Sequence, residues 1–289
     1  MNCSDLDRSL AFYGDLLGLT PGVRTTPTAP QPGGAFGLDT AQWDARILSG
    51  EAGYEGVALD LLEWQVPPPN GTPYSPANHV GFTRLGLVTR DIDDAYARLS
   101  SAGVDCFGPP HDIALEGAPS VRAFVCADPD GTLIELVSGN SERIAFLAIG
   151  CTDLARSSDF YVDLLGFKEL ARFAPDPHDG AGLRIDGDVE WEMAYLDDGS
   201  GQFAIDMTQW KRPAPALPAY PSANNLGIFR MALITTDIDA DYAELERRGI
   251  ACVSPPATLD MGPGLPKLRA LLFPDPDGAM LELIEAPTP

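Results

Sequence analysis

Basic residues, histidines and paired cysteines are scarce in this sequence, and each shortage excludes a class of protein. Only 19 Lys and Arg stand against 42 Asp and Glu, and the net charge of −23 disfavours contact with nucleic acid or anionic membrane surfaces. Five cysteines without CxxC spacing and three histidines argue against a disulfide framework or a zinc knuckle. No apolar run approaches the roughly 18 residues of a membrane span, and no secretory signal pattern opens the chain. We predict a cytoplasmic protein.

An internal repeat is the strongest feature that is present. Residues 3–18 align with residues 151–166 at an offset of 148, and eleven of the sixteen positions are identical. Three further pairs of segments align at offsets of 146 or 147: residues 57–64 with 203–210, 81–93 with 227–239, and 128–137 with 275–284. The chain is a duplication. We predict two domains, residues 1–140 and 141–289.

Each half contains a second level of order. Asp5 and Asp91 each precede a run with helical spacing, and Gly18 and Gly103 follow these runs as expected left-handed stops. Short strand-like runs broken by Gly, Pro and Asp come after each helix, and the last of them follows a DPDG turn. The pattern predicts an α+β fold with four βαβββ units. Either the first unit lacks its opening strand, or the true start of the protein lies upstream of Met1.

Two of these motifs occur twice and resemble a known family. A βαβββ unit with a DLxRSxxFYxDLLG helix and a DPDGxxxEL last strand is similar to the vicinal oxygen chelate superfamily, which includes glyoxalase I, bleomycin-resistance proteins and extradiol dioxygenases. The resemblance implies two tandem glyoxalase-like domains with curved, barrel-like mixed sheets around a cavity. In metal-dependent members, His from the first strands and Glu from the last strands hold the ion.

The positions that correspond to metal ligands carry no imidazole here. The first-strand positions fall on Arg84, Phe146 and Arg230. The last-strand positions remain acidic: Asp60, Glu135, Asp206 and Glu282. An arginine offers no lone pair and repels a cation, so we predict neither a metal nor a cofactor.

Strand alternation and the resemblance place Arg84 beside Glu135, and Arg230 beside Glu282, on the cavity side of the sheets. We predict nitrogen–oxygen separations within about 4 Å in both pairs. Two interpretations stay open. The pairs are structural ion pairs, or the guanidinium groups bind a carboxylate, phenolate or carbonyl oxygen of a ligand.

Asp60 and Asp206 are candidate general bases, and the alternative is that each is ionised and paired with an arginine. Aromatic residues on the same strands are candidates for a wall that stacks on a flat ligand, with a core role as the alternative: Trp64, Trp191 and Trp210. The histidines lie among Pro and Gly, which is typical of surface loops: His79, His111 and His178.

Three functions are consistent with these features. The first is metal-independent binding of a small aromatic or carbonyl-bearing molecule, as in bleomycin-resistance proteins. The second is a metal-free isomerase, lyase or cyclase with an Asp base and an Arg oxyanion stabiliser. The third is a metal-dependent glyoxalase or dioxygenase. The only partner we expect is a small molecule, and a duplication within one chain is compatible with a monomer.

The two cavities are not expected to be equal. Residues 143–149 supply an opening strand to the third unit, and the first unit has no counterpart. An incomplete unit leaves an open side, which weakens polar contacts inside the cavity. We therefore predict that Arg230 matters more for ligand binding than Arg84.

Overall fold

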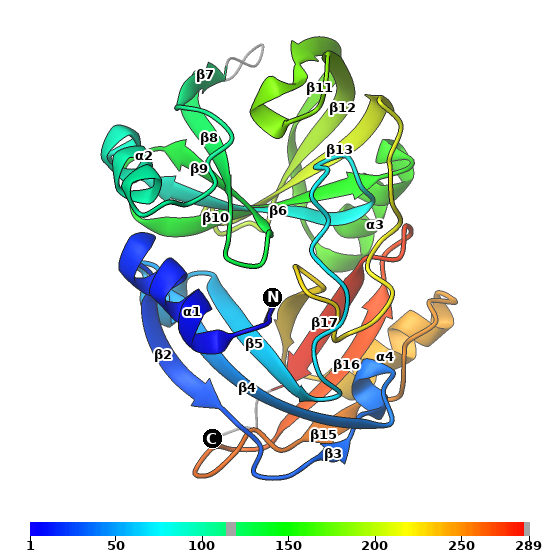
Figure 1. Cartoon of the computed structure of the whole chain (residues 1–289). Helices are drawn as coiled ribbons and strands as arrows, with labels where there is room; N and C mark the ends of the chain where they lie inside the picture. Colours follow the sequence, from blue (N-terminus) through cyan, green and yellow to red (C-terminus); the bar gives the residue numbers. More distant parts are fainter. Residues whose placement is uncertain (114–119, 286–289) are drawn as a thin grey trace.

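The computed structural model describes residues 1–113 and 120–285, and it contains the four predicted βαβββ units (Figure 1). The elements of the first unit are β1 (Asn2–Cys3), α1 (Leu6–Leu10) continuing as the π-helical turn η1 (Ala11–Leu16), β2 (Thr20–Thr25), β3 (Gln31–Pro32), η2 (Gly34–Phe36), β4 (Thr40–Ser49), η3 (Gly53–Glu55) and β5 (Ala58–Val66). Those of the second are β6 (Gly81–Thr89), α2 (Ile92–Ser101), β7 (His111–Ile113), β8 (Val121–Ala127) and β9 (Leu133–Ser138).

The second half of the chain repeats this order. The third unit consists of β10 (Arg143–Cys151), α3 (Leu154–Leu165), β11 (Lys168–Asp179), η4 (Gly180–Leu183), β12 (Asp188–Asp197) and β13 (Ala204–Arg212). The fourth consists of β14 (Arg230–Thr235), α4 (Ile238–Arg247), β15 (Ala257–Leu259), β16 (Leu268–Pro274) and β17 (Met280–Glu285). No helix in the described part of the chain is long and apolar enough to cross a membrane.

The helix boundaries follow the predicted capping signals. The Asp5 carboxylate accepts a hydrogen bond from the backbone nitrogen of Arg8 at 2.9 Å, and Asp91 caps α2 in the same way through Asp94, also at 2.9 Å. Gly18 and Gly103 have φ angles of 76° and 78°, in the left-handed region that favours glycine. The local chemistry of these residues therefore sets where both helices begin and end.

The strands pair across the two halves of the sequence. An eight-stranded sheet has the order β11-β12-β13-β10-β6-β9-β8-β7, so the third unit joins the second through antiparallel pairing of β10 with β6. The first unit, drawn in blue, lies beside the orange and red fourth unit (Figure 1). The predicted domain boundary falls between β9 and β10, which belong to the same sheet.

The first unit has a short opening strand, which corrects the expectation that it lacks one. Asn2 lies opposite Leu62 of β5 in parallel pairing, and its backbone also exchanges hydrogen bonds with Gly227, at 2.9 and 3.2 Å. This β1 has two residues, whereas β10 has nine. In the described residues, the opening strand of the first unit is therefore joined to the fourth unit by a single backbone bridge, while the second and third units share a continuous ladder.

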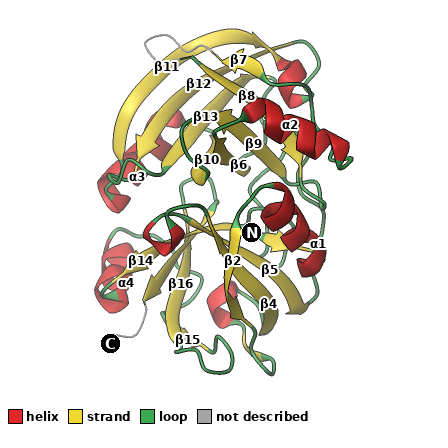
Figure 2. Cartoon of the chain, turned by 90° about the vertical axis from the view of Figure 1, so that its left-hand side faces the viewer, coloured by secondary structure: helices red, strands yellow, loops and turns green. Residues whose placement is uncertain are grey.

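The helices cover the outer faces of the sheets, and the opposite faces curve around the interior (Figure 2). Tyr13 and Tyr161 pack in the core between helix and sheet, fully buried. Their hydroxyls donate to the Asp residues that open the DPDG turns, to Asp128 at 2.9 Å and to Asp275 at 3.2 Å. Burial raises the pKa of both carboxyls to about 6. These contacts fasten the first unit to the second, and the third to the fourth.

Candidate functional site

Arg84 lies on the inner face of the eight-stranded sheet, opposite the helices. Its neighbours Leu85 and Leu87 point into the helix-covered core, so strand alternation directs Arg84 to the other side. Arg84 Nε donates to Glu135 Oε2 at 2.7 Å, and Nη2 donates to Asp206 Oδ2 at 3.2 Å. The predicted Arg84–Glu135 pair is confirmed. We name these three residues the Arg84 centre.

The register of the sheet explains why Asp206 reaches Arg84. On the strand between them, Ala148 lies directly opposite Asp206 on one side and opposite Arg84 on the other. A methyl side chain leaves room for the ion pair to form above it. Asp206 also accepts a hydrogen bond from the Thr208 hydroxyl at 3.1 Å. The centre therefore combines strands from the second and third units.

The Arg84 centre is largely withdrawn from water. The side chains of Arg84, Glu135 and Asp206 are 10%, 12% and 15% exposed. Burial raises the pKa of Asp206, the Arg84 guanidinium opposes that rise, and the nearby Glu135 carboxylate adds to it. With two carboxylates and one guanidinium, the centre has a formal charge of −1.

The fourth and first units form a repeat-related centre around Arg230. Arg230 Nε donates to Glu282 Oε2 at 2.6 Å, which confirms the second predicted pair, and Nη2 donates to Asp60 Oδ2 at 2.8 Å. Arg230 Nη1 and Asp60 Oδ1 are buried without a hydrogen-bond partner among the described residues. We name this set the Arg230 centre.

Hydrophobic core lies on the face of β5 that carries Asp60, since Leu62 and Trp64 follow Asp60 at two-residue spacing and belong to one buried cluster. Trp64 is 1% exposed, and its Nε1 donates to Asn2 Oδ1 at 3.1 Å. Phe36 meets Trp43 and Trp64 edge-on, with ring centroids 5.8 and 5.4 Å apart. These contacts surround the Trp64 ring on several sides. The geometry therefore favours the core interpretation of Trp64 over the ligand-stacking one.

The two tryptophans of the third unit have different surroundings. Trp210 is 5% exposed and packs with Val125 and Leu133 in a core cluster. Trp191 is half-buried at the edge of this cluster, where the His178 ring stacks on it at a centroid distance of 4.7 Å. The contacts of Trp210 are those of a core residue, while Trp191 is partly accessible.

The expectation that the three histidines lie in surface loops is wrong, because two of them lie on strands and the third, in a connector, is buried. His178 belongs to β11, because this strand continues through the Pro-containing stretch. His79 is 1% exposed beside Tyr74 and Tyr220, and burial lowers its pKa to about 4. The Pro-rich connectors pack against each other here, which the sequence of either connector alone does not reveal. His111 is exposed, as expected, although it lies on β7.

The sequence interpretation missed an apolar patch next to the Arg84 centre. Tyr195 lies directly opposite Asp206 in the sheet, and it packs with Phe146, Val88, Val137 and a few small residues. Tyr195, Val88 and Val137 are only half-buried. Strand alternation in the sequence could have identified Tyr195 as a candidate. It follows Trp191 by four residues on β12 and therefore lies on the same face of the sheet.

Gly86 leaves the space that the Phe146 ring of this patch occupies. A Cβ atom at Gly86 would lie 2.1 Å from an atom of the Phe146 ring, so the ring occupies the space that any larger residue would need. The ring therefore lies directly over β6, two residues from Arg84 along the strand. The patch and the Arg84 centre form one continuous surface with an apolar part and a charged part.

The residues present do not fit the metal that the family resemblance implies. The described residues contain no group of three or more His, Cys, Asp or Glu side chains placed to hold an ion. The guanidinium of Arg84 lies between the two carboxylates and neutralises part of their charge, as a cation would. The donor set, with a guanidinium between the carboxylates and no imidazole, therefore opposes binding of Fe²⁺ or Zn²⁺.

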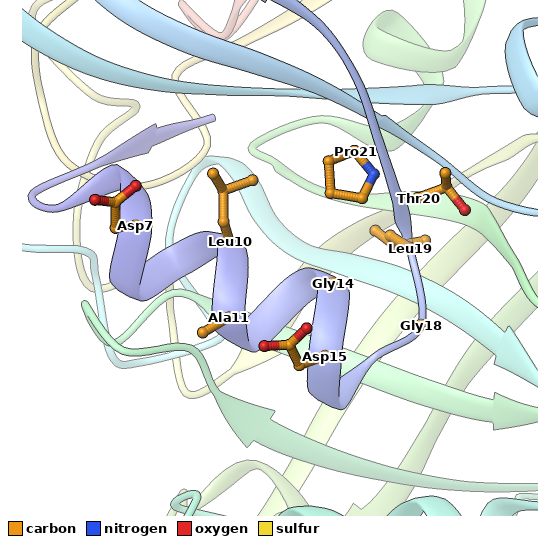
Figure 3. A pocket seen from close by; sticks show the side chains of 9 residues that line it. All are labelled: Asp7, Leu10, Ala11, Gly14, Asp15, Gly18, Leu19, Thr20 and Pro21. Atoms are coloured by element: carbon orange, nitrogen blue, oxygen red, sulfur yellow. The ribbon is translucent and has the colours of Figure 1, made fainter.

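A surface hollow of about 530 Å³ lies elsewhere, between α1, η1 and the start of β2 (Figure 3). Its titratable side chains are Asp7 and Asp15, which take part in neither centre. A smaller hollow of about 380 Å³ borders it, where Arg98 is paired with Asp94. Neither hollow has a buried polar group that a ligand would satisfy, so we do not assign a function to them.

Comparisons with known proteins agree with the repeated fold. A family model described as the Glyoxalase/Bleomycin resistance protein/Dioxygenase superfamily matches residues 1–136 and again residues 143–283. The chain is similar to the uncharacterized protein YaeR of Escherichia coli (strain K12), at 33% identity over 147 residues that make up 50% of this chain and 96% of YaeR.

Solved structures show the same fold over almost the whole chain. Glyoxalase I from Zea mays superposes with a TM-score of 0.67 at 18% identity, covering 98% of this chain and 89% of that one. A point mutant of the same enzyme gives a TM-score of 0.69 at 20% identity, with the same coverage. At this level of identity, the similarity establishes the architecture and leaves the chemistry to the site itself.

Proposed function

This chain belongs to the Glyoxalase/Bleomycin resistance protein/Dioxygenase superfamily, and we propose that it binds a small aromatic or carbonyl-bearing organic molecule without a metal. The proposed binding surface is the Arg84 centre together with the adjoining apolar patch of Tyr195 and Phe146. The ligand would place a flat ring on the patch and a polar group at the centre.

The Arg84 centre itself is the observation that carries this proposal. An arginine with two carboxylates stands where metal-dependent relatives would need neutral nitrogen donors. Small-molecule sites combine a mainly apolar lining with a few fixed polar groups. The half-buried Tyr195, Val88 and Val137 beside Arg84 and Glu135 provide that combination.

One premise of the reasoning that favoured Arg230 differs from the observed fold. That expectation assumed that each cavity lies within one half of the chain, whereas Arg230 pairs with Asp60 of the first unit, which has the two-residue opening strand. Arg84 lies among the full-length strands β6, β10 and β13. Because the face of β5 that carries Asp60 continues into the buried cluster of Trp43 and Trp64, we assign a structural role to that centre.

A fragment screen with paired variants tests the proposal. Saturation-transfer NMR of EDTA-treated protein with aromatic amides, phenols and ketones should detect ligands, and Tyr195→Ala should weaken them at least tenfold. The matched control is Ile47→Ala, because Ile47 lies opposite Asp60 as Tyr195 lies opposite Asp206. An absence of ligands, or ligands lost in Ile47→Ala and retained in Tyr195→Ala, would contradict the proposal.

A metal-free enzyme is the second candidate, and the buried Asp206 favours it. Burial raises the pKa of this carboxyl, which brings it closer to the range useful for proton transfer, and Arg84 is placed to stabilise a developing oxyanion. Any NMR-detected ligand should then change chemically over hours with EDTA present. Asp206→Asn should stop that change and leave binding measurable; unchanged ligands would restrict the protein to binding.

A further inference from the structure

The Arg84 centre carries more negative than positive charge. Its single guanidinium contacts both Glu135 and Asp206, and none of these side chains is more than 15% exposed. The apolar patch beside it adds no positive charge, since its members are Ala, Phe, Val and Tyr residues. Solvent screening is weak at such burial, so the net charge acts on any molecule that enters.

Two atoms of the centre are still available to a ligand. Arg84 Nη1 and Glu135 Oε1 make no hydrogen bond with the described residues, because the Arg84 contacts use Nε and Nη2, and Glu135 accepts through Oε2. Neither atom belongs to the buried set that lacks a partner, so each keeps some exposure to solvent. The centre thus offers one donor and one anionic acceptor.

The Arg230 centre has the same charge and a different accessibility. Two of its unpartnered atoms, Arg230 Nη1 and Asp60 Oδ1, are fully buried, while the Asp60 side chain as a whole is 34% exposed. Glu282 is 3% exposed. The chain therefore contains a repeat-related centre of equal formal charge whose free guanidinium nitrogen is closed off, and this centre serves as an internal control.

We infer that the Arg84 centre selects ligands by charge, taking a flat aromatic cation or neutral amide and rejecting a carboxylate of the same shape. The inference rests on the proposed function. An amidinium or amide N–H group donates to Glu135 Oε1, and a cation neutralises the centre. A carboxylate gains one donor from Arg84 Nη1 while it approaches two carboxylates, one of which is Glu135.

Benzamidine, benzamide and benzoate test this directly, because they share one shape and carry charges of +1, 0 and −1 at neutral pH. Dissociation constants should be measured by NMR titration with ¹³C-tyrosine protein, with the Tyr195 signal assigned by Tyr195→Phe. We expect benzamidine and benzamide each to bind at least tenfold more tightly than benzoate. We also expect Glu135→Gln to weaken benzamidine about tenfold and to narrow the gap to benzoate.

The control is Glu282→Gln, which removes the same charge from the Arg230 centre and should leave all three constants unchanged. Benzoate binding as tightly as benzamidine, equal effects of Glu135→Gln and Glu282→Gln, or no binding of any probe at millimolar concentration would overturn the inference. The proposed function would survive each of these results if neutral fragments still bind in a Tyr195-dependent manner. It would fail only if the fragment screen also fails.

Discussion

Replacement of Arg84 by Met should destabilise the protein in a manner that depends on pH. The side chain donates to Glu135 at 2.7 Å and to Asp206 at 3.2 Å, and all three groups are buried. Removal of one partner from a buried ion pair costs about 3–5 kcal/mol, because an uncompensated charge stays in a poorly solvated place. We expect Arg84→Met to lower the free energy of unfolding by that amount at pH 8.

The loss of unfolding free energy in Arg84→Met should be smaller at acidic pH. Without Arg84, the folded-state pKa of Asp206, which burial already raises, rises further above the unfolded value of about 4. A group with a raised folded pKa stabilises the fold fully below its unfolded pKa and loses that contribution as pH rises through the folded value. The difference between wild type and Arg84→Met should therefore be small near pH 4.5 and largest at pH 8.

Urea unfolding at pH 4.5, 6 and 8, followed by tryptophan fluorescence, measures this difference. The control combines Arg84→Met with Glu135→Gln and Asp206→Asn, which removes the buried charges together and should recover most of the stability at pH 8. A loss that is equal at all three pH values, or one below about 1 kcal/mol, would refute the account of the Arg84 centre. If Arg84→Met alone does not fold at pH 8, the prediction still requires the triple variant to fold at that pH.

Three further predictions concern residues outside the two ion-pair centres. Gly86→Ala should displace the Phe146 ring, weakening ligand binding and costing about 1–3 kcal/mol of stability by overpacking, as unfolding and NMR titration would show; unchanged ligand affinity would place the binding surface elsewhere. Trp64→Phe leaves the buried Asn2 Oδ1 without its donor and should cost about 1–3 kcal/mol, with no effect on ligand affinity; a selective loss of affinity would argue against a core role. The pKa of Asp128 is raised to about 6 in the folded state, so its contribution to the free energy of unfolding should fall as pH rises from 4 to 8. The stability of Asp128→Asn relative to wild type should therefore increase by up to about 3 kcal/mol over that range. A stability difference that calorimetry finds independent of pH would contradict this.

The sequence predicts both arginine–glutamate pairs because it contains the same local pattern twice. Arg84 and Arg230 occupy equivalent strand positions, and alternation within a strand fixes the face on which a side chain lies. The DPDG turn likewise fixes the position of the last strand. Pairs that depend on neighbouring strands of one unit, such as Arg84 with Glu135, are therefore accessible to a pattern argument.

The partners from the opposite half are not accessible in this way. A repeat shows that four units exist, but it does not show which units share a sheet, because any two of them present equivalent strand edges. The pairing of β10 with β6 is a tertiary choice, and it alone brings Asp206 to Arg84. The prediction that favoured Arg230 assumed instead that each cavity lies within one half of the chain.

Repeat-equivalent tryptophans illustrate the same limit. Trp43 and Trp191 occupy equivalent positions, yet Trp43 is 2% exposed against Phe36 while Trp191 is partly accessible beside His178. The difference comes from the segments that pack on each ring, η2 in one case and β11 in the other. Local sequence at the tryptophan carries no information about these neighbours.

Metal titration of the purified protein tests the central claim most directly. After EDTA treatment and dialysis, Zn²⁺, Ni²⁺, Mn²⁺ and Fe²⁺ should be titrated by calorimetry, and the dialysed samples should then be subjected to elemental analysis. If Arg84 replaces a metal between Glu135 and Asp206, no stoichiometric metal will be retained, and fragment binding will be the same before and after EDTA treatment. One equivalent of a retained metal that Asp206→Asn abolishes would contradict the account.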